Sequence, residues 1–224
     1  MNKNNNSFFT SEQKGNHDDT AHNYDISVMS DYVTGDLIRE KYFDVLKEAI
    51  VMSDLSEELE VLDIGIGTGL LTEMIPVDLK MYGIDISIKM MDKLKEKKLN
   101  AYLKLGSFLS IPFENACFNR IISTFAFHHV PFDKKNDAFC EMDRILKRGG
   151  YIVIGDLMFK NKADEKELRA RFERLGKTDI LFEFDDEFFT DILESSQFLI
   201  GLGYKCEYKQ VSTLSWVLKA IKSI

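Results

Sequence analysis

The sequence predicts an α/β fold in which helices cover both faces of a doubly wound, mostly parallel sheet. Short apolar runs alternate with helical segments between residues 59 and 154, an alternation typical of parallel sheets. After residue 200, two strand-like runs follow each other within a few residues. A parallel crossover needs a longer connection, so these two runs must pair antiparallel. We therefore expect a parallel sheet that ends in one C-terminal antiparallel strand pair.

Hydrophobic periodicity and helix signals give the individual elements. The first helix is expected over 36–50, because its apolar residues recur at helical spacing. Asp133 is the expected N-cap of a later helix, with Lys147 and Arg148 near its C-terminal dipole and Gly149-Gly150 as its stop. Residues 161–187 carry only a narrow apolar stripe. Strands are expected at 59–64, 81–84, 101–105, 120–124, 151–154, 204–211 and 214–220, and further helices from about residue 70, at 87–98 and at 188–201.

Length and composition limit the class of protein. A chain of 224 residues favours one domain, here 21–224, preceded by a polar tail at 1–20 that we expect to be disordered or loosely packed. The net charge of −8 argues against nucleic acid as a partner. No apolar run reaches the roughly 20 residues that span a bilayer, and no signal peptide is visible, so we expect no membrane partner and a cytoplasmic location. The three cysteines are far apart and suggest neither disulfides nor a zinc knuckle.

A glycine-rich loop and a following carboxylate indicate a site for a nucleoside cofactor. A buried strand leads into Gly65, Gly67 and Gly69, and a helix begins directly after them. Glycines allow the backbone to pass close to a ligand, and the helix N-terminus then faces that ligand. Asp85 lies 20 residues after Gly65, about where a carboxylate accepts both ribose hydroxyls. Together these features predict an adenosine-containing cofactor.

The glycine spacing distinguishes between classes of cofactor. Dinucleotide sites read G-x-G-x-x-G, whereas this loop reads G-x-G-x-G and has Leu70 where the dinucleotide pattern needs a small residue. Asp63 precedes the glycines at the strand end, where it suits an ammonium group. The spacing favours a nucleoside with an amino-acid tail over a dinucleotide.

The chain resembles the class I S-adenosylmethionine (SAM)-dependent methyltransferases, particularly those of the ubiquinone- and menaquinone-biosynthesis type, over roughly residues 20–220. The resemblance implies a seven-stranded, Rossmann-like sheet with an antiparallel last strand, and SAM as the cofactor. The segments that carry it are Val61–Leu70, Gly83–Ser87, Gly106–Phe108, Ile121–Val130 and Arg144–Gly150.

The resemblance also implies which residues contact SAM. Ser107 departs from the family pattern, which often has Asp there, so we expect adenine contact from Ser107 or from the Phe108 backbone. The segment His22–Asp25 resembles an N-terminal tyrosine segment that folds over the cofactor, although an ordinary surface tyrosine is an equal alternative. The expected cofactor-binding residues are Tyr24, Asp63, Gly65, Gly67, Gly69, Asp85, Ile86, Ser107, Phe108 and Ser123.

His128 and His129 are the candidates for catalysis, because they follow the fourth strand at the edge of the sheet where ligands bind. Adjacent residues of an extended chain point opposite ways, so at most one is expected to face the acceptor, as a base or as a contact. Alternatively, both are structural. With two histidines and no third ligand in sight, we expect no metal. Tyr32, Asp156 and Phe159 are further candidates for lining the acceptor pocket.

Two segments, 21–50 and 160–190, are candidate caps over the acceptor site. The second contains an aromatic group that forms either a lid over an apolar substrate or simply core: Phe182, Phe184, Phe188 and Phe189.

The predicted function is methyl transfer to a small-molecule acceptor by in-line displacement. Two alternatives remain at this point: a non-catalytic SAM-binding protein, and a nicotinamide-dependent oxidoreductase, which the glycine spacing disfavours. The Asn/Asp-Pro-Pro-Tyr signature of enzymes that methylate amino groups of adenine or glutamine is absent, and Ser123–Ala126 stands in its place. The identity of the acceptor and the oligomeric state are not predicted.

Overall fold

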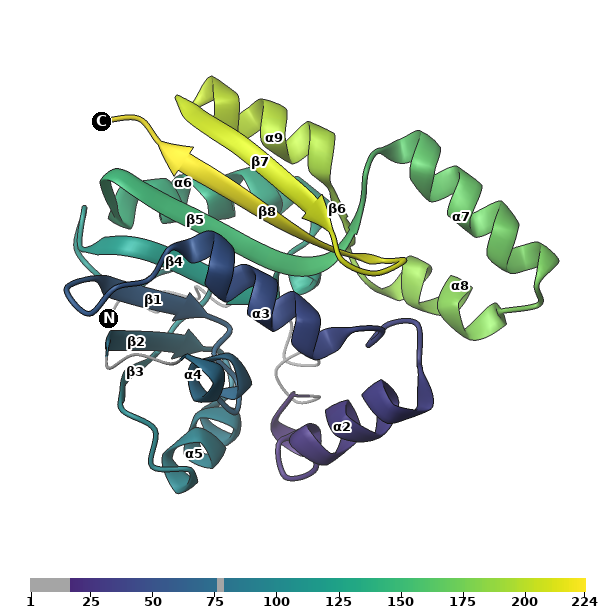
Figure 1. Ribbon diagram of the computed structural model, residues 1–224, viewed down its shortest axis with the longest axis horizontal. Coiled ribbons are helices and arrows are strands. Elements are labelled where there is room, and N and C mark those ends of the chain that lie inside the picture. Colours follow the sequence, from purple (N-terminus) through teal and green to yellow (C-terminus); the bar gives the residue numbers. More distant parts are fainter. Residues whose placement is uncertain (1–16, 76–78) are drawn as a thin grey trace, which may run out of the picture.

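A single twisted sheet forms the centre of the computed structural model, which describes residues 17–75 and 79–224 (Figure 1). The strands lie in the order β3-β2-β1-β4-β5-β8-β7, and the short β6 pairs with the end of β5. Strands β1 to β5 pair parallel, whereas β8 is antiparallel to both β5 and β7. This topology confirms the predicted sheet with its C-terminal antiparallel pair. The strands are β1 Glu60–Ile64, β2 Lys80–Asp85, β3 Ala101–Leu105, β4 Phe118–Thr124, β5 Leu146–Phe159, β6 Thr190–Asp191, β7 Tyr204–Gln210 and β8 Ser215–Lys222.

Helices cover both faces of the sheet because alternate strand residues point to opposite sides. In β1, Val61 joins the core beneath α3 and α4, and Leu62 joins the core beneath α6 and α9. Helix α5 packs over the β2–β3 side through Met91 and Leu94. The helices are α2 Tyr24–Thr34, α3 Tyr42–Ser53, α4 Leu70–Met74, α5 Ile88–Glu96, α6 Lys135–Ile145, α7 Lys162–Arg174, α8 Thr178–Asp186 and α9 Ile192–Gly201, with the 3-10 turns η1 Phe127–His129 and η2 Phe132–Lys134.

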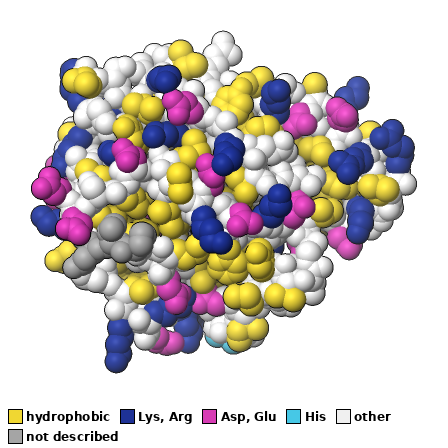
Figure 2. All heavy atoms as spheres, in the orientation of Figure 1, with side chains coloured by type: hydrophobic (Ala, Val, Ile, Leu, Met, Phe, Trp, Pro, Cys, Tyr) yellow, Lys and Arg dark blue, Asp and Glu magenta, His cyan; other side chains and the backbone are white. Residues whose placement is uncertain are grey.

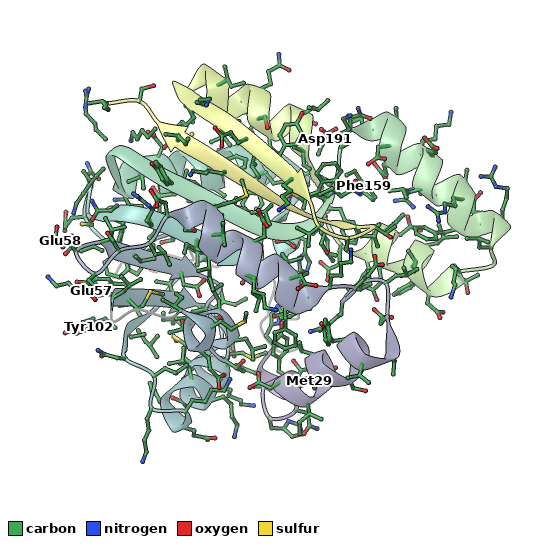
Figure 3. All side chains as sticks on the ribbon, viewed as in Figure 1. Met29, Glu57, Glu58, Tyr102, Phe159 and Asp191 are labelled. Carbon is green, nitrogen blue, oxygen red and sulfur yellow. The ribbon has the colours of Figure 1, made fainter. Side chains whose placement is uncertain are left out.

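Helices α7 and α8 extend beyond the carboxyl end of β5 and have an aromatic core of their own (Figure 1). Phe159 marks the point where the chain leaves β5 (Figure 3). Its ring packs against Phe184 of α8 and Phe189, with centroid separations of 5.0 and 5.3 Å. Phe172 of α7 joins the same buried cluster. These contacts fix the α7–α8 pair against the end of the sheet.

The N-terminal part of the domain differs from the prediction. The helix expected over 36–50 begins at Tyr42 and continues to Ser53, and a separate helix, α2, precedes it. Gly35 ends α2 in the left-handed conformation. The chain becomes helical again only at Tyr42, six residues after the expected start at residue 36. Of the predicted tail, residues 1–16 lie outside the described residues, and residues 17–20 are helical.

The boundaries around α6 also correct the prediction. Asp133 lies in η2, and Lys134 is the N-cap, without a side-chain capping bond. The helix ends at Ile145, because Leu146 is already extended and pairs with Phe118 of β4. Lys147, Arg148 and the pair Gly149-Gly150 therefore belong to β5, which begins before a shift in its register with β4.

The surface carries side chains of both charges. On the face shown in Figure 2, Lys and Arg side chains are interspersed with Asp and Glu. Within residues 17–75 and 79–224, no helix has the length and apolar character required to cross a membrane.

Candidate functional site

The glycine loop leaves β1 through three residues in the left-handed conformation. Gly65, Gly67 and Gly69 have φ values of 76°, 55° and 83°, which side chains rarely adopt. A Cβ at Gly65 would also collide with Ala126, because the loop lies directly against the segment after β4. At Gly69, a Cβ would meet Leu94 of α5 at 2.8 Å. Gly65 therefore lets the loop pack on the segment after β4, and Gly69 lets it pack on α5. Gly67 lines the cavity, where a Cβ would meet only Gly65 O among the described residues, at 3.9 Å.

Asp85 ends β2 beside this loop and is 9% exposed. Its two carboxylate oxygens accept hydrogen bonds from Gly67 N and Ser87 N, both at 2.8 Å. Burial raises the pKa of Asp85, although these backbone N–H groups act in the opposite direction. Each oxygen keeps lone-pair capacity for a further donor, as required for binding ribose hydroxyls.

Asp63 lies beneath the glycine loop at the end of β1 and is 1% exposed. Its Oδ1 has no hydrogen-bond partner among the described residues. Burial, followed by the charge of Asp85, raises the pKa of Asp63 to about 8. A buried oxygen without a partner is costly, and the ammonium group of an amino-acid tail would satisfy it.

A cavity of about 520 Å³ opens at the carboxyl ends of the parallel strands and brings most of the predicted residues together. Asp63, Gly69 and Ser123 do not line it; Ser123 is buried within β4. The predicted residues that do line it are Tyr24, Gly65, Gly67, Asp85, Ile86, Ser107, Phe108, His128 and His129.

Both histidines line this cavity. The expectation that at most one of them faces the acceptor stays a prediction. That expectation assumed extended chain after β4, whereas residues 127–129 form the 3-10 turn η1. The turn brings the His128 and His129 rings to a centroid separation of 4.0 Å. Lys135 helps to fix it by donating from Nζ to Phe127 O at 2.9 Å.

Asp156 orients His128 from behind. This fully buried carboxylate contacts His128 Nδ1 at 2.5 Å and accepts backbone N–H bonds from Phe127 and His128 at 2.6 and 3.1 Å. Burial acts to lower the pKa of His128, but the charge and hydrogen bond of Asp156 raise it above its ordinary value. With Nδ1 engaged, Nε2 is the ring nitrogen that remains for a ligand.

His129 has a carboxylate of its own. Its Nδ1 contacts Glu187 Oε2 at 2.9 Å. Phe188 N donates to His128 O at 2.9 Å, which holds the segment after α8 against η1.

The His17 ring meets His129 edge-on at a centroid separation of 4.8 Å. Burial, followed by the charge of His129, lowers the pKa of His17 to about 4.

Several cavity residues were missed by the sequence analysis. His17 falls within the predicted tail, and Glu183 and Glu187 fall in a charged segment with no motif. Arg39 precedes α3, and its buried Nη1 has no hydrogen-bond partner in the described part of the chain. Its Nε pairs with Asp31 at 3.5 Å, and only the fold shows that this arginine lines the cavity, so no sequence signal identifies it.

Other predicted pocket residues are elsewhere. Tyr32 is 38% exposed on α2 and packs on Phe43, and Phe159 is core. Asp156 lies behind His128 and does not line the cavity. The lid interpretation of the aromatic group is wrong: Phe184 and Phe189 are core, Phe182 is exposed, and Phe188 packs on Phe132.

The N-terminal helix is anchored directly to the glycine loop. Asp25 of α2 accepts a hydrogen bond from Thr68 Oγ1 at 2.5 Å and pairs with Lys97 Nζ at 2.6 Å. Ser87 Oγ donates to Asp18 Oδ1 at 2.6 Å. Residues 17–25 therefore close one side of the cavity.

Fold and site together define an α/β protein whose cavity, at the carboxyl edge of the sheet, suits an adenosine-containing cofactor. Comparison with known proteins identifies the family. Residues 62–154 match the model of the methyltransferase domain. An uncharacterized methyltransferase of Anoxybacillus flavithermus is 31% identical over 163 residues, which cover 72% of this chain and 77% of the relative. Another, from Bacillus cereus, is 30% identical over 94% of this chain and 98% of its own length.

A solved structure shares the fold. Magnesium protoporphyrin IX methyltransferase from Synechocystis PCC 6803, with bound SAH, superposes with a TM-score of 0.72 at 15% identity, covering 96% of this chain and 100% of that one. The chain belongs to the class I SAM-dependent methyltransferases.

Proposed function

We propose that this chain transfers a methyl group from SAM to a small-molecule acceptor held beside His128 and His129. The observation that carries the proposal is that the cofactor loop and the histidine pair line one cavity. Its volume of about 520 Å³ lies within the roughly 300–1,000 Å³ typical of small-molecule sites. Cofactor and acceptor must share this space, which favours a small acceptor. The net charge of −8 also favours a small molecule over nucleic acid.

Polar groups of the cavity wall, together with Asp63 buried beneath the glycine loop, match the parts of SAM. Asp85 would accept the ribose hydroxyls, and the unpartnered Oδ1 of Asp63 would accept the ammonium group. Arg39, whose Nη1 is buried without a partner among the described residues, suits the carboxylate of the same tail. Ser107 and Phe108 would lie against the adenine, with Tyr24 covering the cofactor from α2.

The protein contributes placement and proton handling. SAM supplies a methyl group already activated by its sulfonium. Holding the acceptor in line at near-contact distance lowers the barrier by several kcal/mol. Where the acceptor must lose a proton, His128 is oriented to take it at Nε2, because Asp156 holds Nδ1. His129 lies beside it as a second acceptor contact.

Segments 21–50 and 160–190 are proposed to cap the acceptor site. The first contributes Tyr24, Arg39 and Tyr42 to the cavity lining, and the second contributes Glu183 and Glu187. A cap of this kind would limit the access of water during transfer.

Turnover separates this proposal from a non-catalytic SAM-binding role. Purified protein is incubated with SAM and panels of small phenols, thiols, amines and carboxylic acids, and the S-adenosylhomocysteine formed is quantified. Formation above the acceptor-free control supports catalysis. Tight SAM binding without turnover on any panel favours the sensor or inactive-subunit alternative.

Variants of the histidine pair test its role. We expect His128→Ala to bind SAM within about threefold of wild type, while turnover falls roughly 10²- to 10⁴-fold, the range for removal of a general acid or base. Lys47→Ala, which removes an exposed side chain of α3 outside the cavity, is the control. Loss of SAM binding in a folded His128→Ala protein would assign that histidine to the cofactor.

A further inference from the structure

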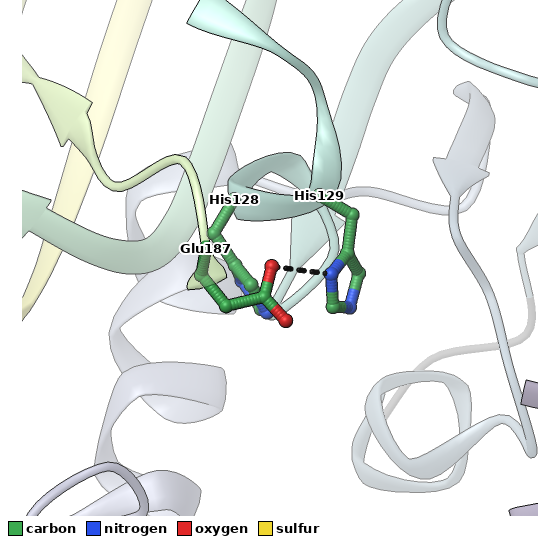
Figure 4. A group of neighbouring side chains, drawn as sticks. All are labelled: His128, His129 and Glu187. Atoms are coloured by element: carbon green, nitrogen blue, oxygen red, sulfur yellow. Dashed lines mark hydrogen bonds and ion pairs between the residues drawn. The ribbon is translucent and has the colours of Figure 1, made fainter. Parts of the chain in front are cut away.

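The acceptor side of the cavity contains two imidazoles and a carboxylate that converge on one point (Figure 4). We propose that His128, His129 and Glu187 bind a divalent transition-metal ion there. The inference rests on the proposed function, because the ion would lie where the acceptor binds. It reverses the expectation of no metal, which followed from seeing two histidines and no third ligand.

The fold supplies that third ligand from a distant part of the chain. Glu187 follows α8, and the hydrogen bond from Phe188 N to His128 O holds it against η1. One ligand atom from each of the three side chains lies within 4.8 Å of the others. Figure 4 shows the Glu187 carboxylate in front of the His128 ring, with a dashed line joining it to His129.

These separations suit an ion after a small adjustment. With metal–ligand bonds of roughly 2.0–2.2 Å, neighbouring ligands of a tetrahedral site lie about 3.3–3.6 Å apart. His129 Nδ1 and Glu187 Oε2 are 2.9 Å apart, close to that range. All three ligand atoms lie within 4.8 Å of one another, so the widest separation must shorten by at most about 1.5 Å. Side-chain rotation of Glu187, which is only partly buried, can provide this movement.

Asp156 provides the support that metal-bound histidines usually have. Such a histidine donates its other ring N–H to a carboxylate or carbonyl, which fixes its tautomer and its orientation. His128 Nδ1 and Asp156 Oδ1, 2.5 Å apart, form this arrangement. It directs the Nε2 lone pair away from Asp156 and leaves it for an ion.

The donor set indicates the class of ion and its chemistry. Two imidazoles and a carboxylate suit Zn²⁺, Fe²⁺, Co²⁺ or Ni²⁺, and three protein ligands leave coordination positions open.

An acceptor hydroxyl or thiol bound at an open position loses its proton to solvent more readily, because the ion lowers the pKa of that group. The acceptor atom then forms its bond to the methyl carbon as the sulfur–carbon bond breaks, and the sulfonium becomes a neutral thioether. With the ion bound, His128 acts as a ligand and not as the proton acceptor.

Metal titration of tag-free, chelator-treated protein tests the inference directly. Zn²⁺ binding is followed by calorimetry, and Co²⁺ binding by its visible absorption. We expect one ion per chain, with affinity at least tenfold lower in His129→Ala and in the conservative Glu187→Gln. Glu173→Gln, which alters an exposed carboxylate on α7 outside the cavity, should bind as wild type does.

Binding of S-adenosylhomocysteine by every variant verifies folding and separates the two proposals. Wild type that binds this ligand but no metal overturns the inference and leaves the proposed function intact. Metal affinity unchanged in His129→Ala and Glu187→Gln also overturns it, since the ion then binds elsewhere. Failure of wild type to bind S-adenosylhomocysteine would instead count against the proposed function.

Discussion

At the scale of single residues, Asp85 links the cofactor loop to the strand that follows it. Its carboxylate holds Gly67 N and Ser87 N, and it lies on the cavity wall. The loop conformation and the proposed ribose contact therefore depend on the same side chain.

We predict that Asp85→Ala weakens SAM binding at least tenfold, or about 1.4 kcal/mol, because it leaves ribose hydroxyls and two backbone N–H groups without an acceptor. Calorimetric titration measures the change. Asp92→Ala, which removes an exposed carboxylate paired with Lys95, is the control. Unchanged affinity in Asp85→Ala would contradict the ribose assignment.

If Asp63 accepts the ammonium group as proposed, cofactor binding depends on pH. Its pKa of about 8 means that the free protein holds a proton there at neutral pH. A bound ammonium group favours the carboxylate, so binding releases that proton and becomes tighter as pH rises from about 6 to 7.5. We predict this dependence for S-adenosylhomocysteine binding to wild type, and a weaker dependence for Asp63→Asn. Equal pH profiles for the two proteins would contradict it.

The raised pKa of Asp63 also makes the free energy of unfolding depend on pH. Between its ordinary pKa near 4 and its folded value near 8, folded Asp63 keeps a proton that the unfolded chain has released. The contribution of Asp63 to the free energy of unfolding is therefore greatest below pH 4 and falls as pH rises through 8. The difference between wild type and Asp63→Asn across this range isolates the contribution.

At the scale of elements, η1 is the feature that local pattern predicts least well. The sequence around His128 and His129 was interpreted as extended chain, but the turn is stabilised by groups distant in sequence. Asp156 of β5 accepts three successive N–H groups of residues 126–128, and Lys135 of α6 binds the carbonyl of Phe127. No local propensity encodes these contacts.

Asp156→Ala should destabilise the protein by about 3 kcal/mol, because it leaves several buried N–H groups of η1 without an acceptor. Urea denaturation measures the free energy of unfolding. Asp156→Asn, which keeps an acceptor oxygen, should lose less. Equal losses in the two variants would show that the carboxylate does not support the turn through these bonds.

At the scale of the whole molecule, the sequence predicts the sheet well because each parallel strand is a short buried run between turn signals. The glycine loop and Asp85 are predictable for the same reason, since both are local to strand ends. Helix boundaries are less well predicted: tertiary pairing extends β5 back to Leu146, where residue pattern alone continues the helix.

The side of the site formed by the histidines and their carboxylate partners can be predicted only once the fold is known. Glu187 is 58 residues from His129, and Asp156 is 28 residues from His128. Because charged residues usually face solvent, nothing in the sequence distinguishes Glu187 from its acidic neighbours. Only the packing of α7 and α8 against β5 places it in the cavity.

Calorimetric titration of the purified protein with SAM, S-adenosylhomocysteine and NAD tests the central claim most directly. The geometry of the glycine loop, Asp63 and Asp85 predicts micromolar binding of both SAM ligands and no binding of NAD. Binding of NAD without binding of SAM would contradict the cofactor assignment and, with it, the proposed methyl transfer.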